Sequence, residues 1–175
     1  MPVLAECAAS GRKAIVFSQW VGTLGTLRER LARFFPLEFH GGVASNRRDA
    51  VIEQFRRDRK ASLLLMSYGA GSVGLNLQFA GYVFLFDRWW NPAVEDQAIN
   101  RAHRIGAAGP VTVTRFLTLG TIEERIDQVL QEKRELFDSI FRDGAGASRN
   151  HGFSREEIFG LFHLKPPVER NRDAA

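Results

Sequence analysis

The chain has 175 residues, of which 45% are hydrophobic and 25% are charged. This composition is typical of one globular domain with a real core, and it excludes a largely disordered chain. The longest strongly apolar runs, 63–66 and 83–86, are far shorter than the roughly 20 residues of a membrane-spanning helix. The single cysteine, Cys7, excludes a disulfide framework and a metal site with several thiolate ligands.

The charge balance is mildly basic, with 24 Lys and Arg against 20 Asp and Glu and a formal net charge of +4. This balance permits a polyanionic partner, but a solvated basic surface is equally compatible with it. Residues 1–6 show neither the basic nor the apolar region of a signal peptide, so we expect a cytoplasmic protein with no membrane partner.

Strands and helices alternate in the first half of the chain. Residues 1–12 are expected to form a short helix or a loose lead-in, and the apolar, β-branched run 13–17 predicts a buried strand. Apolar residues at helical spacing then predict a helix over 20–34, which Pro36 stops. The next predicted elements are a strand at 37–39, a helix capped by Ser45, and a strand at 62–67.

The second half continues the alternation. A strand is predicted at 82–87, and Asn91 as cap with Pro92 as first helical residue predicts a helix to about 104. The later predicted elements are a strand at 111–117, a helix over 122–141 opened by a Thr121–Glu124 capping box, a linker at 142–153, and a short helix with a frayed tail at 154–175.

This alternation indicates an α/β fold with a mainly parallel sheet. Ligands of such sheets bind at the carboxyl ends of the strands, so the turns after those ends are the places to search. One such turn, Gly69–Gly74, matches the G-x-G-x-x-G pattern of dinucleotide sites. Only residues 75–81 separate it from the next strand, which is too short for the crossover helix of such a site.

A second candidate site lies on the helix that Pro92 opens. Gln97, Arg101 and Arg104 are spaced by four and three residues and share one helix face, which suits a polyphosphate. Pairing of both arginines with surface carboxylates explains the spacing equally well. The Trp89–Trp90 pair is compatible with a core, an interface or a base-stacking role.

The residues that several kinds of active site require are absent from this sequence. It contains no G-x-x-x-x-G-K-[ST] phosphate loop and no acidic pair after a strand to hold Mg²⁺. The four histidines do not have metal-ligand spacing, so no metal site is predicted. Ser18 and Ser67 lack a nucleophile elbow.

The residues from Trp90 to Gly106 resemble motif VI of the Snf2/Swi2 family of DNA-dependent ATPases, a branch of the superfamily 2 helicases. Residues 15–19, 40–55 and 64–77 resemble motif IV, the block after it and motif V, and 121–126 resemble the closing T-I-E-E-x-I helix. The resemblance covers about 13–141, and the 154–164 helix is similar to the end of bacterial members. Four positions depart from the family pattern: Gly69, Ser72, Asn100 and Ala107.

The resemblance implies a C-terminal RecA-like lobe, a three-layer domain that closes on a first lobe to hold ATP. Arg101 and Arg104 match the arginine fingers, and Gln97, Gly71 and Gly74 match positions that bind ATP. The first lobe, in cis or in trans, would bring the phosphate loop and Mg²⁺. Matching contacts to the backbone of double-stranded DNA are Gln19, Gly41, Arg48, Ser67 and Asn76.

The resemblance therefore predicts half of the ATPase site of a nucleoid-associated DNA translocase or remodeller, inactive alone, in a fragment or a split subunit. The alternative is a stand-alone module that binds DNA or a protein and has no enzymatic activity.

Overall fold

The computed structural model describes residues 2–70, 75–89, 91–103, 109–142 and 160. The chain divides into two compact units: Met1–Trp89 with Ala93–Leu117, and Trp90–Pro92 with Thr118–Ala175. Among the described residues, no helix is long and apolar enough to cross a membrane. The predicted linker and C-terminal helix lie outside the described residues, apart from Arg142 and Gly160.

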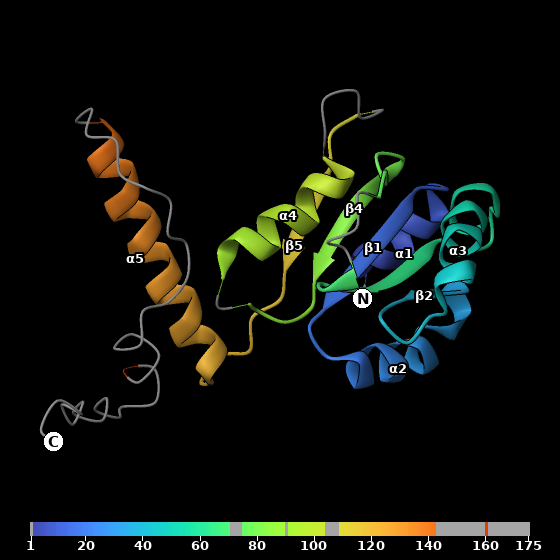
Figure 1. Cartoon of the computed structure of the whole chain (residues 1–175), viewed down its shortest axis with the longest axis horizontal. Coiled ribbons are helices and arrows are strands. Elements are labelled where there is room, and N and C mark those ends of the chain that lie inside the picture. The colour runs from blue at the N-terminus through green and yellow to red at the C-terminus, as the bar shows by residue number, and fades with distance from the viewer. Residues whose placement is uncertain (1, 71–74, 90, 104–108, 143–159, 161–175) are drawn as a thin grey trace, which may run out of the picture. The chain divides into compact units, whose positions relative to one another are not determined.

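The described part of the first unit contains a five-stranded sheet in the order β2-β3-β1-β4-β5 (Figure 1). The strands are β1 Lys13–Ser18, β2 Leu37–Phe39, β3 Leu63–Ser67, β4 Ala80–Leu85 and β5 Thr112–Arg115. All four strand pairings are parallel, which confirms the predicted fold class. Strand β1 is central, and its last residue, Ser18, lies opposite Ser67 of β3.

Helices cover both faces of this sheet. They are α1 Pro2–Ala9, α2 Val21–Arg30, the 3₁₀ turn η1 Ala32–Phe34, α3 Ser45–Arg57 and α4 Pro92–Ala102. Ile15 and Phe17 of β1 pack in one core cluster with α3 and α4, whereas Ala14 and Val16 pack in the other with α1 and α2. Because both faces are buried, the strands are nearly continuous apolar runs, and this is why they could be predicted from the sequence.

Strand β1 lies where the chain reverses its direction across the sheet. The chain leaves β1 through α2 toward β2, and it leaves β4 through α4 toward β5 at the opposite edge. Ligands of open parallel sheets bind outside the carboxyl ends of the strands at such a point. The described residues between β3 and β4 form no α-helix.

Two predictions about helix ends are wrong. Ser45 does not cap α3: it is the first residue of the helix, and the cap position is Ala44, which has no side-chain cap bond. The helix predicted over 20–34 ends at Arg30, and η1 follows it. The tighter 3₁₀ turn has three residues per turn, so it keeps Phe34 in the buried register of the helix before it.

In the second unit, helix α5 spans Ile122–Arg142, close to the predicted range. Thr121 Oγ1 accepts the Glu123 N–H at 3.2 Å, and Glu124 Oε2 accepts the Gly120 N–H at 2.8 Å. Each of these bonds falls one residue earlier than in the standard capping box. The two acidic residues of the first turn also stabilise the helix, because their negative charge lies at the positive end of the helix dipole.

Candidate functional site

The carboxyl ends of β1 and β4 meet at the buried carboxylate of Asp87, which is 8% exposed and follows β4. It accepts hydrogen bonds from the Ser18 hydroxyl and from the Gln19 N–H, the latter at 2.8 Å. Ser67 lies opposite Ser18 in the register of β3 and β1. The structure therefore brings the predicted site residues Gln19 and Ser67 together at neighbouring strand ends.

Gly41 and Arg48 belong to one loop-and-helix unit after β2. The Arg48 guanidinium donates to the carbonyl oxygens of Val43 at 3.0 Å and Gly41 at 3.2 Å. His40 Nδ1 accepts the Gly42 N–H at 3.1 Å in the same loop. Arg48 therefore fixes the shape of the loop in which Gly41 is exposed, and these bonds use two of its five N–H groups.

Asn76 is exposed in the connection between β3 and β4, where its side-chain oxygen accepts the Gln78 N–H at 3.2 Å. Ser67 Oγ accepts the Ala70 N–H at 3.3 Å, so it shapes the start of the same connection. Both side chains stabilise turns, as short polar side chains commonly do.

Helix α4 carries two of the residues predicted to bind ATP. Gln97 is exposed and Arg101 is half-buried, one turn further along the same face. The Leu77 N–H donates to the Arg101 carbonyl at 3.1 Å, which joins the end of α4 to the chain that follows the glycine-rich turn. Gly71, Gly74 and Arg104 lie outside the described residues.

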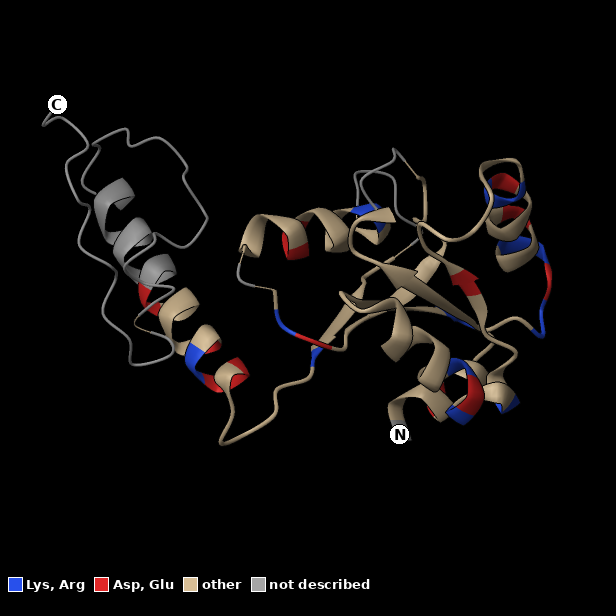
Figure 2. Cartoon of the chain, turned by 60° about the horizontal axis from the view of Figure 1, so that its bottom comes forward, with Lys and Arg blue, Asp and Glu red and all other residues tan. Residues whose placement is uncertain are grey.

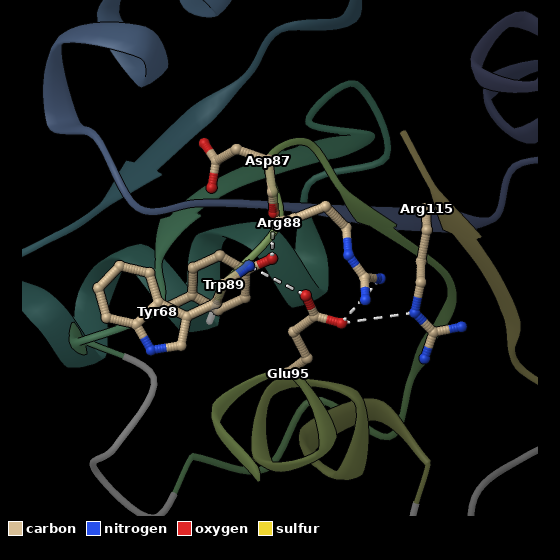
Figure 3. A network of polar contacts seen from close by, with 6 residues as sticks. All are labelled: Tyr68, Asp87, Arg88, Trp89, Glu95 and Arg115. Atoms are coloured by element: carbon tan, nitrogen blue, oxygen red, sulfur yellow. Dashed lines mark hydrogen bonds and ion pairs between the residues drawn. The ribbon is translucent and has the colours of Figure 1, made fainter. Parts of the chain in front are cut away.

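The sequence analysis missed a buried ionic network around Glu95, which is fully buried in the first turn of α4. Glu95 Oε1 accepts the Trp89 N–H at 3.1 Å, while Oε2 lies 3.2 Å from Arg88 Nη1 and 3.5 Å from Arg115 Nε. Figure 3 shows Glu95 rising from α4, with dashed lines from its carboxylate to Arg88 and Arg115. The network ties α4 to the chain after β4 and to the last residue of β5.

The sequence does contain a signal that Glu95 is buried. Pro92, Glu95, Ala98 and Ala102 are the buried residues of α4, with spacings of three, three and four. Glu95 thus occupies the apolar register of an amphipathic helix, where a carboxylate must be paired with cations.

Tyr68 lies beneath this network and stacks on Phe17, with ring centroids 5.6 Å apart. Its hydroxyl donates to the Asp87 carbonyl at 3.0 Å. Burial, and after it the negative charges of Glu95 and Asp87, raise the pKa of Tyr68 well above its usual range. The hydroxyl therefore stays a donor at any working pH.

Positive charge gathers on α3 and on the chain that leaves it, where Lys and Arg recur in Figure 2. Glu53 pairs with Arg57 and lies 3.8 Å from Arg56, so it offsets part of that charge. A basic helix near strand ends suits the phosphates of a nucleic acid, and such contacts carry little sequence information.

The chain is similar in sequence to helicase proteins. The family model of the helicase conserved C-terminal domain matches residues 2–106. DNA repair protein RAD5B of Arabidopsis thaliana is 46% identical over 138 residues, which cover 78% of this chain and 11% of that protein. The uncharacterized ATP-dependent helicase MG018 of Mycoplasma genitalium is 35% identical over 162 residues, which cover 91% of this chain and 16% of that protein. The chain thus spans less than a fifth of either relative.

The fold is similar to a solved structure, that of the Sulfolobus solfataricus SWI2/SNF2 ATPase core in complex with double-stranded DNA. The TM-score is 0.63 at 33% sequence identity, over 82% of this chain and 31% of that chain. The chain belongs to the helicase conserved C-terminal domain family, and its fold and sequence are those of a C-terminal RecA-like lobe of the Snf2/Swi2 type.

Proposed function

We propose that this chain is the second motor lobe of a Snf2-type ATPase that moves along or remodels double-stranded DNA. The observation that carries the proposal is the bond from the Leu77 N–H to the Arg101 carbonyl. It joins the helix that bears the expected arginine finger to the segment that follows the glycine-rich turn. Two segments expected to face ATP are thus held to each other by the fold of this lobe. The name of the Mycoplasma relative supports ATP use, and the DNA in the Sulfolobus complex supports a duplex ligand.

In this proposal, Arg101 and Arg104 offset the charge that develops on the γ-phosphoryl oxygens of ATP during hydrolysis. A guanidinium suits this task because it stays charged and presents a fixed fork of donors. Gln97 lies one turn before Arg101 on the same face and helps to orient it. Backbone N–H groups of Gly71 and Gly74 approach the phosphates, as glycine allows.

A partner lobe completes the site. It supplies the phosphate loop and the acidic residues that hold Mg²⁺, which neutralises phosphate charge when bound. Because this sequence lacks that loop, we expect the chain alone to hydrolyse no ATP.

The DNA-binding surface in this proposal is the carboxyl edge formed by β2, β3 and β1. The residues expected to contact the DNA backbone are Gln19, Gly41, Arg48, Ser67 and Asn76. Three of them, Gln19, Gly41 and Ser67, follow or end adjacent strands, since the sheet order places β2, β3 and β1 side by side. Contacts to phosphates fix the register of a duplex without reading its sequence.

The test is ATP hydrolysis by the purified chain with and without duplex DNA, alone and then with its first lobe in cis or in trans. We expect no turnover by the chain alone, and DNA-stimulated turnover once the first lobe is present. Replacing Arg101 or Arg104 by Ala should lower that turnover by about 10³-fold or more, because an arginine finger supplies a factor of this size.

Arg33→Ala is the matched control. The Phe34 carbonyl accepts the N–H of Ser62, just before β3, so Arg33 lies at the amino edge, away from the site. ATP hydrolysis by the chain alone would contradict the proposal that it holds only half of the ATPase site. DNA binding without any turnover in the presence of the first lobe would favour the alternative of a non-enzymatic module.

A further inference from the structure

Two buried carboxylates hold the short segment Asp87–Trp89 from opposite sides. The Asp87 side chain accepts the Ser18 hydroxyl and the Gln19 N–H, so it fixes the exit of β1. The Glu95 side chain accepts the Trp89 N–H and pairs with Arg88, so it fixes the same segment to α4. Only the main chain of three residues separates the two attachments.

The charges of this cluster balance. Asp87 and Glu95 supply two negative charges, while Arg88 and Arg115 supply two positive ones, and all four act on the buried Tyr68. Arg88 is 7% exposed, and its guanidinium lies 3.2 Å from the Glu95 carboxylate. Breaking a buried pair on one side leaves the other charge uncompensated, which is strongly unfavourable. The contacts therefore favour one fixed arrangement of the cluster.

The cluster reaches both expected ligand surfaces. On one side, the Asp87 carboxylate accepts the Gln19 N–H and the Ser18 hydroxyl. Ser67 lies opposite Ser18 in the register of β3 and β1. On the other side the cluster holds the first turn of α4, and a helix transmits displacement along its length. Arg101 lies in the last turn of α4.

We propose that Asp87 and Glu95 are positioning residues that couple the DNA-facing end of β1 to helix α4. DNA bound at the carboxyl edge then restrains β1, the Asp87–Trp89 segment and α4 together, and so orders the helix that bears Arg101. The inference rests on the proposed function for the identity of the ligand. It explains how DNA stimulates ATP hydrolysis through the contacts that join β1, the Asp87–Trp89 segment and α4.

The experiment measures amide hydrogen exchange of the 175-residue chain, free and saturated with a short DNA duplex. In the unaltered chain, DNA should slow exchange at residues 96–102 by about fivefold or more, the lower end of usual coupling between sites. Glu95→Gln keeps the size of the side chain and removes its charge. In this variant, DNA affinity should stay within about twofold while the slowing in α4 disappears.

Glu38→Gln is the matched control, because Glu38 forms an ion pair with Arg28 at 2.9 Å on β2, outside the cluster. It should leave the slowing in α4 unchanged. Arg115 supplies a second pair of variants, since its side chain is 37% exposed and tolerates change better than Glu95. Arg115→Lys keeps the charge beside Glu95 and should keep the slowing, whereas Arg115→Gln should lose most of it.

The outcomes separate the two proposals. If the unaltered chain binds no DNA, the proposed function is contradicted and this inference falls with it. If DNA binds and exchange in α4 does not change, or if the slowing persists in Glu95→Gln, the coupling alone is overturned. If circular dichroism shows that Glu95→Gln does not fold, the Arg115 pair decides, and equal slowing in Lys and Gln variants overturns the inference.

Discussion

The Ser18 hydroxyl donates a hydrogen bond to the Asp87 carboxylate, across the central strand pair β1 and β4. Both side chains are buried, at 0% and 8% exposure. The bond joins the carboxyl ends of the two strands from which the chain departs in opposite directions. It therefore holds the sheet together at the point where parallel sheets bind ligands.

Ser18→Ala should destabilise the protein by about 1–3 kcal/mol, because a buried carboxylate loses one of its donors. The Trp20 N–H, which donates to Ser18 Oγ at 3.1 Å, also loses its acceptor. Urea unfolding measures the change. Ser10→Ala is the control: its hydroxyl donates to the Cys7 carbonyl at 2.8 Å but is exposed, so the change should stay within about 0.5 kcal/mol. Equal effects of the two variants would contradict a special role for the Ser18–Asp87 bond.

Two glycines of the first unit should respond to alanine in opposite directions. A Cβ on either Gly11 or Gly25 would meet nothing within 4 Å, so only the backbone decides. Gly25 lies inside α2, and Gly25→Ala should stabilise the protein by about 0.5–1 kcal/mol. Gly11 has φ +67°, and Gly11→Ala should cost about 1–2 kcal/mol. Thermal unfolding tests both, and shifts of the same sign would show that contacts other than the backbone dominate.

The regular elements could be predicted from the sequence because their signals are local. The run 63–67 is apolar throughout since both faces of β3 are covered, and Pro92 begins α4 because its fixed φ suits the first helical position. The order of the strands, which arranges the carboxyl edge, was not among the sequence predictions.

The Glu95 network could not be predicted in this way. Its partner Arg115 is 20 residues away in the chain and reaches it because Arg115 pairs in register with Leu85 of β4. Register between strands is a property of the whole sheet, so the partner of a buried charge cannot be read from nearby residues. The burial of Glu95 itself was accessible, through its place beside Ala98 in the apolar face of α4.

Cys7 should make stability depend on pH in the alkaline range. It is buried, its thiol donates to the Arg12 carbonyl at 3.3 Å, and burial raises the pKa of the thiol from 9.0 to about 11. Since the folded pKa is the higher one, its contribution is fully present below pH 9 and is lost as the pH rises through about 11. The difference in unfolding free energy between the unaltered chain and Cys7→Ala should therefore shrink over this range.

Thiol labelling gives an independent measurement of the same shift. At pH 8 the folded chain should hold about a hundredfold less thiolate than the urea-unfolded chain, and should react slower by at least that factor. Equal labelling rates would show that Cys7 is accessible and that its pKa is not raised.

Arg48 is the residue for which direct and indirect roles in DNA binding can be separated. Its guanidinium holds the loop of Gly41 and Val43, and it is also an expected phosphate contact. If it contacts a phosphate, Arg48→Ala should weaken duplex binding and lower the slope of log affinity against log salt by about one. Fluorescence anisotropy over a series of salt concentrations measures both quantities, with Arg33→Ala as the unaffected control. A lower affinity at an unchanged slope would instead mean that Arg48 acts through the shape of the loop, and no change in either would remove it from the DNA surface.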